Sequence, residues 1–497
     1  MSDTTPPPRS IKEPSYFDAL APLVVLALLI GGAVTLFGLD AMEGPLQVGI
    51  MVAAMVTAAI VLKNGHPWDA IAESGRRGVS SVVSAIFILF AVGALIGTWN
   101  MSGTIPTMVY YGIQLINPDW FYLATVVICA VISLGIGSSW TTAGTIGVGL
   151  VGLALMVGVS PVITAGAVIS GAYVGDKLSP LSETTILTAQ ITGNDIHTHL
   201  RAQVWTTIPA FIISMIVFTA FGVFDGTSGL GEAVVNSELS ALNQLFWITP
   251  LNLIPLALLI GLSVFKVPPV LAIMASALVA GILACFLQPD AVLRFVDDPT
   301  LTAPANFIKG IWQVMATGYY SASGIPPVDS LLSRGGMDSM LFTVWLILGA
   351  LVFGTLLDEF GLLSKLVTPI LLRAKTTGSL IGTVVATALG LNIVAGDQYV
   401  ALVLPARLFR VEFEKRGLAT TNLSRTVADA GTVTSPLVPW NSCGAYMAAV
   451  LGVPTLLYMP YAIFNIASPL LTLLYGITGF KVVRVDPIIP EDTPLKA

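Results

Sequence analysis

A polar break interrupts a long apolar segment of this sequence at residues 175–185, GDKLSPLSETT. A second break of the same kind, GTVTSPLVPWN, occupies residues 431–441 in the other half of the chain. Each is preceded by another polar interruption, LGIGSSWTT at residues 134–142 and LGLNIVAGDQ at residues 389–398. Broken apolar segments at matching positions of two halves are the best sequence indication of the binding site of a secondary transporter. We therefore expect two repeats, with a site where they meet.

Composition indicates a membrane protein. Of the 497 residues, 55% are hydrophobic and only 10% are charged, and the mean hydropathy is +0.87. Soluble domains carry roughly 25% charged residues. The three cysteines, Cys129, Cys285 and Cys443, all lie in apolar runs, so we interpret them as small buried hydrophobic residues and not as a disulfide framework or a zinc site.

Apolar runs of about 17 to 25 residues qualify as spanning helices. The sequence predicts such runs near residues 17–39, 44–63, 81–98, 203–223, 248–264, 267–287, 340–357 and 455–476. Two further crossings, about 161–200 and 422–452, are broken at Ser-Pro pairs. Residues 119–158 and 377–416 each consist of an apolar arm, a polar tip and a second apolar arm, which favours a re-entrant hairpin, because irregular backbone at membrane depth must be covered by protein or line a watery cavity.

These segments predict an all-α integral membrane protein with about ten crossings, arranged as two five-helix repeats with a hairpin and a broken helix in each. We expect a tail at 1–16, a first repeat at 17–230, a linker at 231–247, a second repeat at 248–480 and a tail at 481–497. An odd number of crossings per repeat inverts the second repeat relative to the first. Inverted repeats suit a carrier, because exchanging the conformations of the two halves exchanges the side to which the site opens.

The distribution of basic residues predicts the orientation. With the N-terminus in the cytoplasm, most Lys and Arg residues fall on the cytoplasmic side, whereas Arg294, Lys309 and Arg334 fall outside. The predicted external loops are instead rich in Asp and Glu. We therefore expect both termini in the cytoplasm.

Hydroxyl groups gather at the first-half breaks. Where a helix is broken, freed carbonyls and neighbouring hydroxyls can coordinate a hard cation. The hydroxyl-bearing candidates for a sodium site are Ser138, Ser139, Thr141, Thr142, Ser179, Ser182, Thr184 and Thr185. The alternative is that small residues only let membrane helices pack closely.

Four carboxyl groups lie near the breaks, namely Asp176, Glu183, Asp397 and Asp429. An ionisable group in a spanning segment costs about 2.5 to 3.5 kcal/mol on insertion scales and is a functional candidate by default. In general, burial raises the pKa of a carboxyl group and a bound cation lowers it, so such a group can exchange a proton for Na⁺. We expect Na⁺ to bind at Ser138, Ser139, Asp176, Thr184 and Asp397.

The neighbours of these carboxyl groups leave alternatives open. Lys177 could neutralise the adjacent Asp176, or could change partners when sodium binds. Asp429 could cap the half-helix that follows or pair with Arg425. Further polar candidates in the second half are Asn392, Gln398, Thr434, Ser435 and Asn441.

Other partners are not expected. The glycine-rich stretches contain no Gly-Lys-Ser/Thr phosphate-binding motif, which disfavours ATP-driven transport. We predict no cofactor and no nucleic-acid partner; Na⁺, protons and the lipid bilayer are the expected partners. His197 and His199 are interpreted as a solvated cytoplasmic helix end, with a pH-sensing role as the alternative.

The breaks and three neighbouring motifs resemble the NhaC family of Na⁺/H⁺ antiporters. The resemblance rests on residues 175–185 and on GTWNMSGTIPT at 97–107, SSWTTAGT at 138–145 and DAGTVTSPLVPWN at 429–441. It covers roughly residues 17 to 480 and implies paired hairpins, a homodimer in a bacterial-type cytoplasmic membrane, and an elevator-like motion of a transport domain against a scaffold. The sequence departs from the family pattern at Glu183, where Asp is frequent, so ion preference or turnover could differ.

Two functions fit these features. The first is a secondary active Na⁺(Li⁺)/H⁺ antiporter that exchanges cytoplasmic Na⁺ for external protons by alternating access. The second is a Na⁺- or H⁺-coupled carrier or exchanger of a small organic solute, a carboxylate or an amino acid. Lys177 is the only basic residue expected near the centre of the membrane, which favours the cation exchanger. Paired broken repeats disfavour a channel.

Overall fold

The computed structural model describes residues 11–115, 118–225 and 232–486. Within these ranges, eight helices are long and apolar enough to cross a membrane, or up to ten if each of two sharply bent helix pairs counts as one span. The only β pairing in the same ranges is a single bridge between Leu418 and Arg484. The predicted all-helical membrane class is confirmed.

The first half contains a helical hairpin and a broken helix. It opens with α1 (Tyr16–Phe37), α2 (Pro45–Lys63), α3 (Trp68–Met101) and α4 (Thr104–Leu115). The hairpin consists of α5 (Phe121–Ile136), α6 (Ser139–Thr142), the π-helical turn η3 (Ala143–Gly147) and α7 (Val148–Val157). The broken helix is α8 (Pro161–Leu178) with α9 (Glu183–Thr192), and α10 (Ile196–Asp225) closes the half.

The second half follows a similar order with an insertion. After α11 (Glu232–Leu245) come α12 (Ile254–Val264), α13 (Pro269–Leu287), the inserted α14 (Pro289–Val296), α15 (Ala303–Thr317) and α16 (Pro326–Leu332), then α17 (Leu341–Glu359) and α18 (Leu362–Arg373). The hairpin is α19 (Thr377–Val394) with α20 (Gln398–Lys415). The broken helix is α21 (Thr420–Val427), the π-helical turn η7 (Ala428–Thr432) and α22 (Ser442–Leu451), followed by α23 (Thr455–Tyr458) and α24 (Ile463–Thr478).

Two predicted spans have wrong boundaries. The span predicted at 81–98 is the longer helix α3, because its polar first turns, with Glu73 and Arg76 on the surface, continue the helix outside any apolar run. The span predicted at 455–476 is divided into α23 and α24 by a 3-10 turn that contains Pro460. Proline supplies no N–H group, so helical hydrogen bonding stops there.

The two hairpins turn where the sequence predicts, at glycines that adopt positive φ. Gly137 has φ +79°, and a Cβ atom there would lie 2.8 Å from the Leu181 side chain. Gly396 has φ +64°. Only glycine adopts this backbone without strain. The first hairpin tip therefore lies against the break that follows α8.

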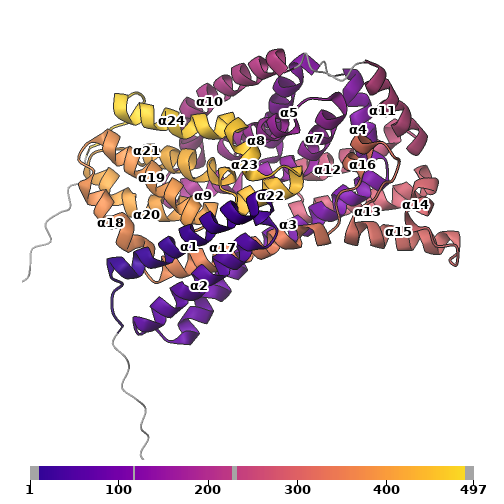
Figure 1. Cartoon of the computed structure of the whole chain (residues 1–497). Helices are drawn as coiled ribbons and strands as arrows, with labels where there is room; N and C mark the ends of the chain where they lie inside the picture. The colour runs from indigo at the N-terminus through magenta and orange to yellow at the C-terminus, as the bar shows by residue number, and fades with distance from the viewer. Residues whose placement is uncertain (1–10, 116–117, 226–231, 487–497) are drawn as a thin grey trace, which may run out of the picture.

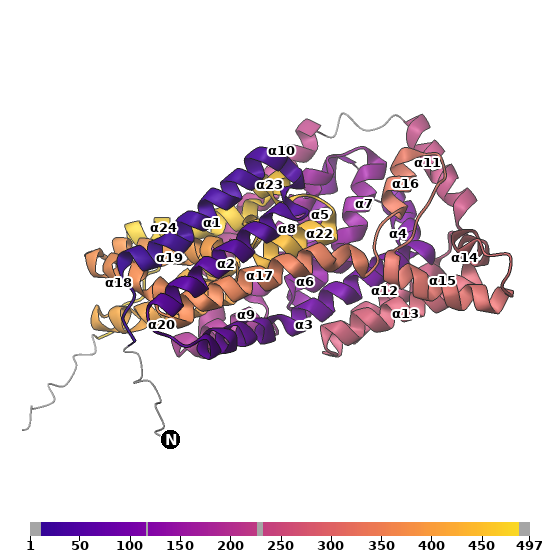
Figure 2. The same cartoon turned by 60° about the horizontal axis from the view of Figure 1, so that its bottom comes forward.

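Helix contacts in one half have counterparts in the other. Helices α3 and α17 pack on each other, α13 packs on α3 as α2 packs on α17, and α5 packs on α10 as α19 packs on α24. In Figure 1, α1, α2, α3 and α17 lie along one side and α8, α10 and α24 along the opposite side. Helices α9 and α22 lie between these two sides in Figure 1, and Figure 2 shows α6 next to α22, which it contacts. This pairing agrees with a repeat; its inversion across a membrane stays a prediction.

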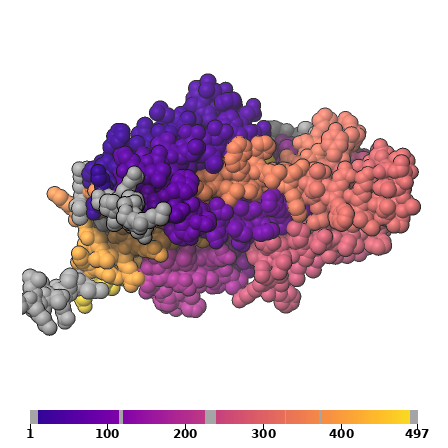
Figure 3. Space-filling view, turned by 90° about the horizontal axis from the view of Figure 1, so that it is seen from below, coloured from indigo at the N-terminus to yellow at the C-terminus, as the bar shows by residue number. Residues whose placement is uncertain are grey.

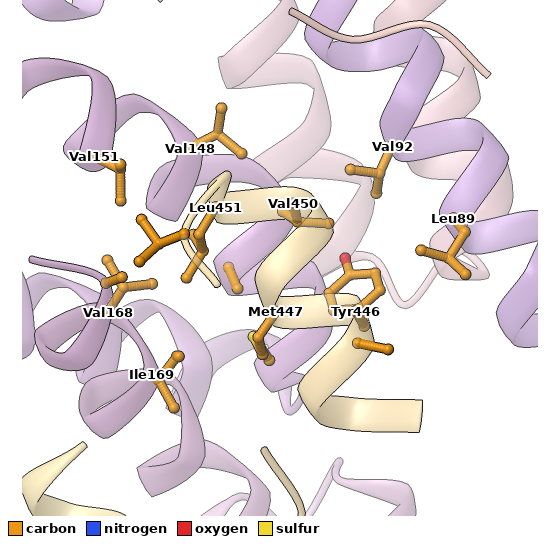
Figure 4. Packing of buried hydrophobic residues seen from close by; sticks show 14 of the residues in the cluster. Leu89, Val92, Val148, Val151, Val168, Ile169, Tyr446, Met447, Val450 and Leu451 are labelled. Carbon is orange, nitrogen blue, oxygen red and sulfur yellow. The ribbon is translucent and has the colours of Figure 1, made fainter. Parts of the chain in front are cut away.

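Helix α22 lies in the hydrophobic core where both halves meet. Figure 4 shows its residues Tyr446, Met447, Val450 and Leu451 among valines of α7 and α8 and beside Leu89 and Val92 of α3. These side chains are buried. The broken helix of the second half is thus packed against the hairpin of the first half, which brings the polar breaks together.

The insertion α14–α16 lies at one end of the molecule, and both ends of the described chain lie at the other (Figure 1). From below, α1–α3 in indigo and purple lie beside the pink and salmon residues 250–340 (Figure 3). A glycine lets the insertion pack closely on α3, since a Cβ atom at Gly97 of α3 would come within 2.5 Å of the Val314 carbonyl oxygen of α15.

Candidate functional site

One cavity brings together the polar tips of both halves. Its volume is about 390 Å³, and it is bounded by both hairpin tips, the first-half break and the side of α3. The predicted site residues in its lining are Ser138, Ser139, Thr141, Asp176, Ser182, Glu183, Thr184, Asp397 and Gln398. This includes all five residues predicted to bind Na⁺.

The break after α8 exposes a backbone carbonyl. In a continuous helix the Asp176 carbonyl would accept a hydrogen bond from the N–H of residue 180, but residue 180 is proline. Three hydroxyl groups donate to this carbonyl oxygen instead, at 3.3 Å from Ser182, 3.2 Å from Thr184 and 2.7 Å from Thr185. The Ser-Pro break thus collects hydroxyl oxygens around one carbonyl.

The Asp176 carboxylate is held at the start of α6. It accepts hydrogen bonds from the Ser139 backbone N–H, at 3.1 Å, and from the Ser139 hydroxyl. Ser138 caps the same helix by accepting from the Thr141 N–H at 3.2 Å. Negative charge is stabilised at a helix N-terminus. Asp176 is 7% exposed and forms no salt bridge with any residue of the described ranges.

The second hairpin contributes a second carboxylate. Asp397 caps α20, where its Oδ1 accepts from the N–H groups of Tyr399 at 2.8 Å and Val400 at 3.0 Å. Glu183 is exposed in the cavity lining and accepts a hydrogen bond from the Tyr399 hydroxyl at 3.2 Å. The one basic residue in this lining, Lys266, is itself exposed. The cavity is therefore suited to a cation.

Lys177 forms an ion pair with Asp429 and not with Asp176. Both side chains of the pair are fully buried. Asp429 also accepts hydrogen bonds from Thr206 at 3.2 Å, from Ser468 at 2.9 Å and from Thr472. Neighbouring residues of a helix point about 100° apart, so Lys177 faces away from Asp176. The interpretation that Lys177 neutralises Asp176 is wrong.

The Arg425 guanidinium contacts a backbone carbonyl and an aromatic ring instead of the Asp429 carboxylate. Its guanidinium donates to the Lys481 carbonyl at 3.1 Å and lies 5.8 Å from the centre of the Tyr475 ring. Of the two alternatives for Asp429, the pair with Arg425 is therefore not formed. Asp429 lies within the π-helical turn η7, and such turns are frequent at functional sites.

The second-half amides form a separate hydrogen-bonded cluster. The Asn392 amide donates to the Gly431 carbonyl at 2.7 Å and to Thr434 at 3.0 Å, and it accepts from Asn441 at 3.1 Å. Asn441 also caps α22. Ser435 donates at 2.7 Å to the Thr432 carbonyl, which Pro436 leaves without its helical donor. These side chains join the second hairpin to the second break.

The structure thus divides the predicted residues into four groups. The first lines the cavity, the second is the Lys177–Asp429 pair itself, the third is the amide cluster, and the fourth lies beside the cavity. Three first-half candidates lie beside the cavity without lining it, and they support the breaks through local hydrogen bonds: Thr142, Ser179 and Thr185.

Several polar residues around the site were missed from the sequence. Ser468 and Thr472 lie four residues apart on α24 and both contact Asp429. Polar residues at helical spacing in an apolar span could have indicated them. Of the two histidines, His197 is exposed as predicted, whereas His199 is buried. The interpretation of His199 as part of a solvated helix end is wrong, because it faces α21, where its Nδ1 contacts the Ser424 hydroxyl at 3.0 Å.

The chain is similar to known proteins over most of its length. The family model described as Na⁺/H⁺ antiporter family matches residues 19–222 and 171–480. The chain is 34% identical to the Na(+)/H(+) antiporter NhaC of Alkalihalophilus pseudofirmus, over 88% of this chain and 95% of that protein. It is 33% identical to the arginine/ornithine antiporter ArcD of Halobacterium salinarum, over 97% and 95% of the two chains.

A third relative is named for a different cargo. The chain is 32% identical to the malate-2H(+)/Na(+)-lactate antiporter of Bacillus subtilis, over 95% of this chain and 96% of that protein. All three relatives are antiporters, and their cargoes differ. By the family match and by these identities over most of its length, the chain is a multi-pass membrane protein that belongs to the NhaC-type Na⁺/H⁺ antiporter family.

Proposed function

We propose that the protein is a secondary active antiporter that exchanges cytoplasmic Na⁺, or Li⁺, for external protons. The observation that carries the proposal is the presence of two carboxylates, Asp176 from the first half and Asp397 from the second, in the lining of one cavity. The membership of the family supports the same exchange.

The proposed Na⁺ ligands are oxygen atoms of Ser138, Ser139, Asp176, Thr184 and Asp397, all in the cavity lining. A sodium ion needs the carboxylate in its ionised form, because a carboxylic acid offers less negative charge to a cation. The same carboxylate therefore holds either a proton or the ion. This competition gives exchange, since release of one cargo on one side permits loading of the other.

The proposed orientation has both termini in the cytoplasm. The cavity extends from Ser84, at the middle of α3, to Lys266 in the turn between α12 and α13. The positive-inside rule places this turn near the cytoplasmic surface. The structure is then the inward-open state of the transport cycle.

The proposed motion is that of an elevator. The transport domain comprises the two hairpins and the two broken helices, and the scaffold comprises α1–α3, α12, α13 and α17. Helix α22 contacts α3 and α17, so it lies on the boundary between the two parts. By resemblance to the family, the scaffold would form a homodimer in the lipid bilayer.

A second candidate is exchange of a small organic solute coupled to Na⁺ or H⁺. Two relatives are named for arginine and ornithine and for malate and lactate. The cavity volume of about 390 Å³ falls in the range of small-molecule pockets. Because Asp176, Glu183 and Asp397 make the lining acidic, it favours a cationic amino acid over a dicarboxylate.

Proteoliposomes that contain a pH-sensitive dye test the proposal. NaCl, LiCl, KCl or choline chloride is added at fixed external pH, and the Asp176→Asn variant serves as the inactive control. A prompt lumenal pH change with Na⁺ alone supports cation/proton exchange. A response only when arginine, ornithine, malate or lactate is also supplied would replace it with the second candidate.

A further inference from the structure

Helix α10 carries a buried polar stripe that lies outside the cavity. His199, Gln203, Thr206 and Thr207 are all 0% exposed, although α10 is otherwise an apolar spanning helix. Residues four and seven or eight apart share one face of a helix. The opposite face, with Val204, Ile208 and Ile212, is exposed. The stripe therefore faces the interior of the protein.

The stripe leads to the Lys177–Asp429 ion pair. Thr206 donates to Asp429 at 3.2 Å and accepts from Lys177 at 3.4 Å. His199 lies at the other end of the stripe, one turn from the start of α10, where His197 and Thr198 are exposed. At a rise of 1.5 Å per residue, the stripe from His199 to Thr207 is about 12 Å long.

Several polar atoms of the stripe have no hydrogen-bond partner among the residues that the structure describes. They are His199 Nε2, both amide atoms of Gln203 and the Thr207 hydroxyl, and Arg425 Nε on the facing helix α21 is another. Buried polar groups are nearly always hydrogen-bonded to protein or to ordered water. Unpartnered atoms spaced along one buried helix face indicate a shared set of bound water molecules.

The hydrogen bonds of His199 leave room for a bound water molecule. When the Ser424 hydroxyl donates its single proton to the Thr421 carbonyl at 3.1 Å, the 3.0 Å contact between Ser424 Oγ and His199 Nδ1 places the ring proton on Nδ1. The neutral ring then presents Nε2 as a hydrogen-bond acceptor. Its buried surroundings provide no donor in the described chain, and a water molecule would supply one.

We propose that His199, Gln203 and Thr207 bind a file of water molecules that conducts protons between the cytoplasmic end of α10 and the Asp429 carboxylate. Each water accepts one proton and passes another on, and Asp429 gains or loses one O–H bond at the inner end. Lys177 remains the neighbouring positive charge. The inference rests on the proposed proton exchange, and it makes Asp429 a second proton-binding group beside the carboxylates of the Na⁺ cavity.

The test has one measurement that needs no transport. Hydroxyl radicals produced by radiolysis in ¹⁸O-labelled water modify buried side chains only where bound water lies beside them. We expect His199 to be modified at a rate within about five-fold of that of exposed His197, and Gln203→Leu to lower the rate at His199 at least five-fold. Absence of modification at His199 in the wild-type protein would overturn the water site.

The second measurement is proton flux in proteoliposomes at saturating Na⁺. We expect Gln203→Leu and Thr207→Val to lower the flux about ten-fold with the KM for Na⁺ unchanged. The matched control is Thr219→Val on the same helix, whose hydroxyl is already bonded to the Met215 carbonyl at 2.7 Å and which should keep wild-type flux. If Gln203→Leu fails to fold, Thr207→Val gives the same test without added volume.

The outcomes separate the two proposals. Wild-type flux in both variants would overturn the proton route. Absence of Na⁺-driven flux in the wild-type protein would instead overturn the proposed function and, with it, the role of the route, while radiolytic labelling alone would still decide whether the water molecules are bound.

Discussion

The Lys177 ammonium group and the Asp429 carboxylate form a fully buried ion pair that joins α8 of the first half to the π-helical turn η7 of the second half. Three hydroxyl groups, those of Thr206, Ser468 and Thr472, donate to the same carboxylate. Removal of two charges from water is costly, and it is offset only when the geometry and the remaining hydrogen bonds are good. The pair therefore holds the two broken helices in a fixed relation.

Loss of one partner of this pair should destabilise the protein strongly. We expect Lys177→Met to lower the free energy of unfolding by about 3 kcal/mol, because it leaves Asp429 charged and buried. The double variant Lys177→Met/Asp429→Asn should recover most of this loss, since Asn still accepts from the three hydroxyls. Denaturant unfolding in detergent measures the free energy of unfolding of both variants. An equal loss of stability in the single and the double variant would contradict the prediction that Asp429→Asn compensates for Lys177→Met.

Neutralisation of Asp176 should abolish exchange and leave the fold intact. Asn can still accept from the Ser139 N–H, but it cannot ionise, so we expect Asp176→Asn to lower Na⁺-driven proton flux by at least 100-fold at normal protein level. Glu183→Gln should only raise the KM for Na⁺ a few-fold, because Glu183 is exposed. Asp40→Asn, at an exposed position in the turn η1 (Gly38–Met42) between α1 and α2, is the control. Near-normal flux with reduced protein level would mark Asp176 as structural.

The Pro180 break should be required for transport and not for stability. Pro180→Ala restores an N–H group that can bond the Asp176 carbonyl and displace the hydroxyls that surround it. We expect transport to fall about ten-fold and the melting temperature to stay the same or rise. Pro209→Ala in α10 is the matched control: the Tyr475 hydroxyl donates to the freed carbonyl of Trp205 at 3.1 Å, and Trp205, Pro209 and Tyr475 do not line the cavity. Equal effects of both substitutions would contradict the proposed role of the break.

Thr185 should contribute to ion affinity through the Asp176 carbonyl. Removal of its hydroxyl in Thr185→Val is expected to cost about 1 kcal/mol of binding free energy, which corresponds to a roughly five-fold rise in the KM for Na⁺. Thr188→Val is the control, because the Thr188 hydroxyl bonds only the carbonyl of Thr184 in its own helix. The exchange rate is measured as a function of Na⁺ concentration for both variants. A larger rise in KM for Thr188→Val than for Thr185→Val would contradict the contribution of the Asp176 carbonyl to Na⁺ affinity.

The proposed inward-open state predicts which positions react from each side. A cysteine at Ser84, in the cavity lining, should react with a membrane-impermeant thiol reagent added to the cytoplasmic face. A cysteine at exposed Thr300, between α14 and α15, should react only from the external face. Native Cys285 is replaced by Ala for this experiment, because Cys129 and Cys443 are buried and Cys285 is not. Labelling of Ser84→Cys by reagent added to the external face would contradict the proposed orientation, since the cavity would then open to the outside.

Much of the fold could be predicted from the sequence. Apolar runs predicted the positions of most spans. Glycine, Ser-Pro pairs and Asp predicted both hairpins and both breaks, because each of these residue types acts on the local backbone. Glycine adopts positive φ, proline lacks an N–H group, and Asp caps a helix. The predicted Na⁺ ligands indeed line one cavity, since the breaks that expose carbonyls also collect the hydroxyls. The boundaries of α3 and α24 were missed where helix continued through polar sequence or bent at proline.

The sequence by itself determined the helical membrane class, the family and the positions of the breaks, because composition, spacing and proline chemistry are local properties. Only the tertiary structure decided which side chains meet across the two halves. Asp176 and Lys177 are neighbours in the chain, yet one faces the cavity and the other reaches Asp429, because successive residues of a helix point in different directions. The burial of His199 against Ser424 depends in the same way on the packing of α10 on α21, which no local pattern contains.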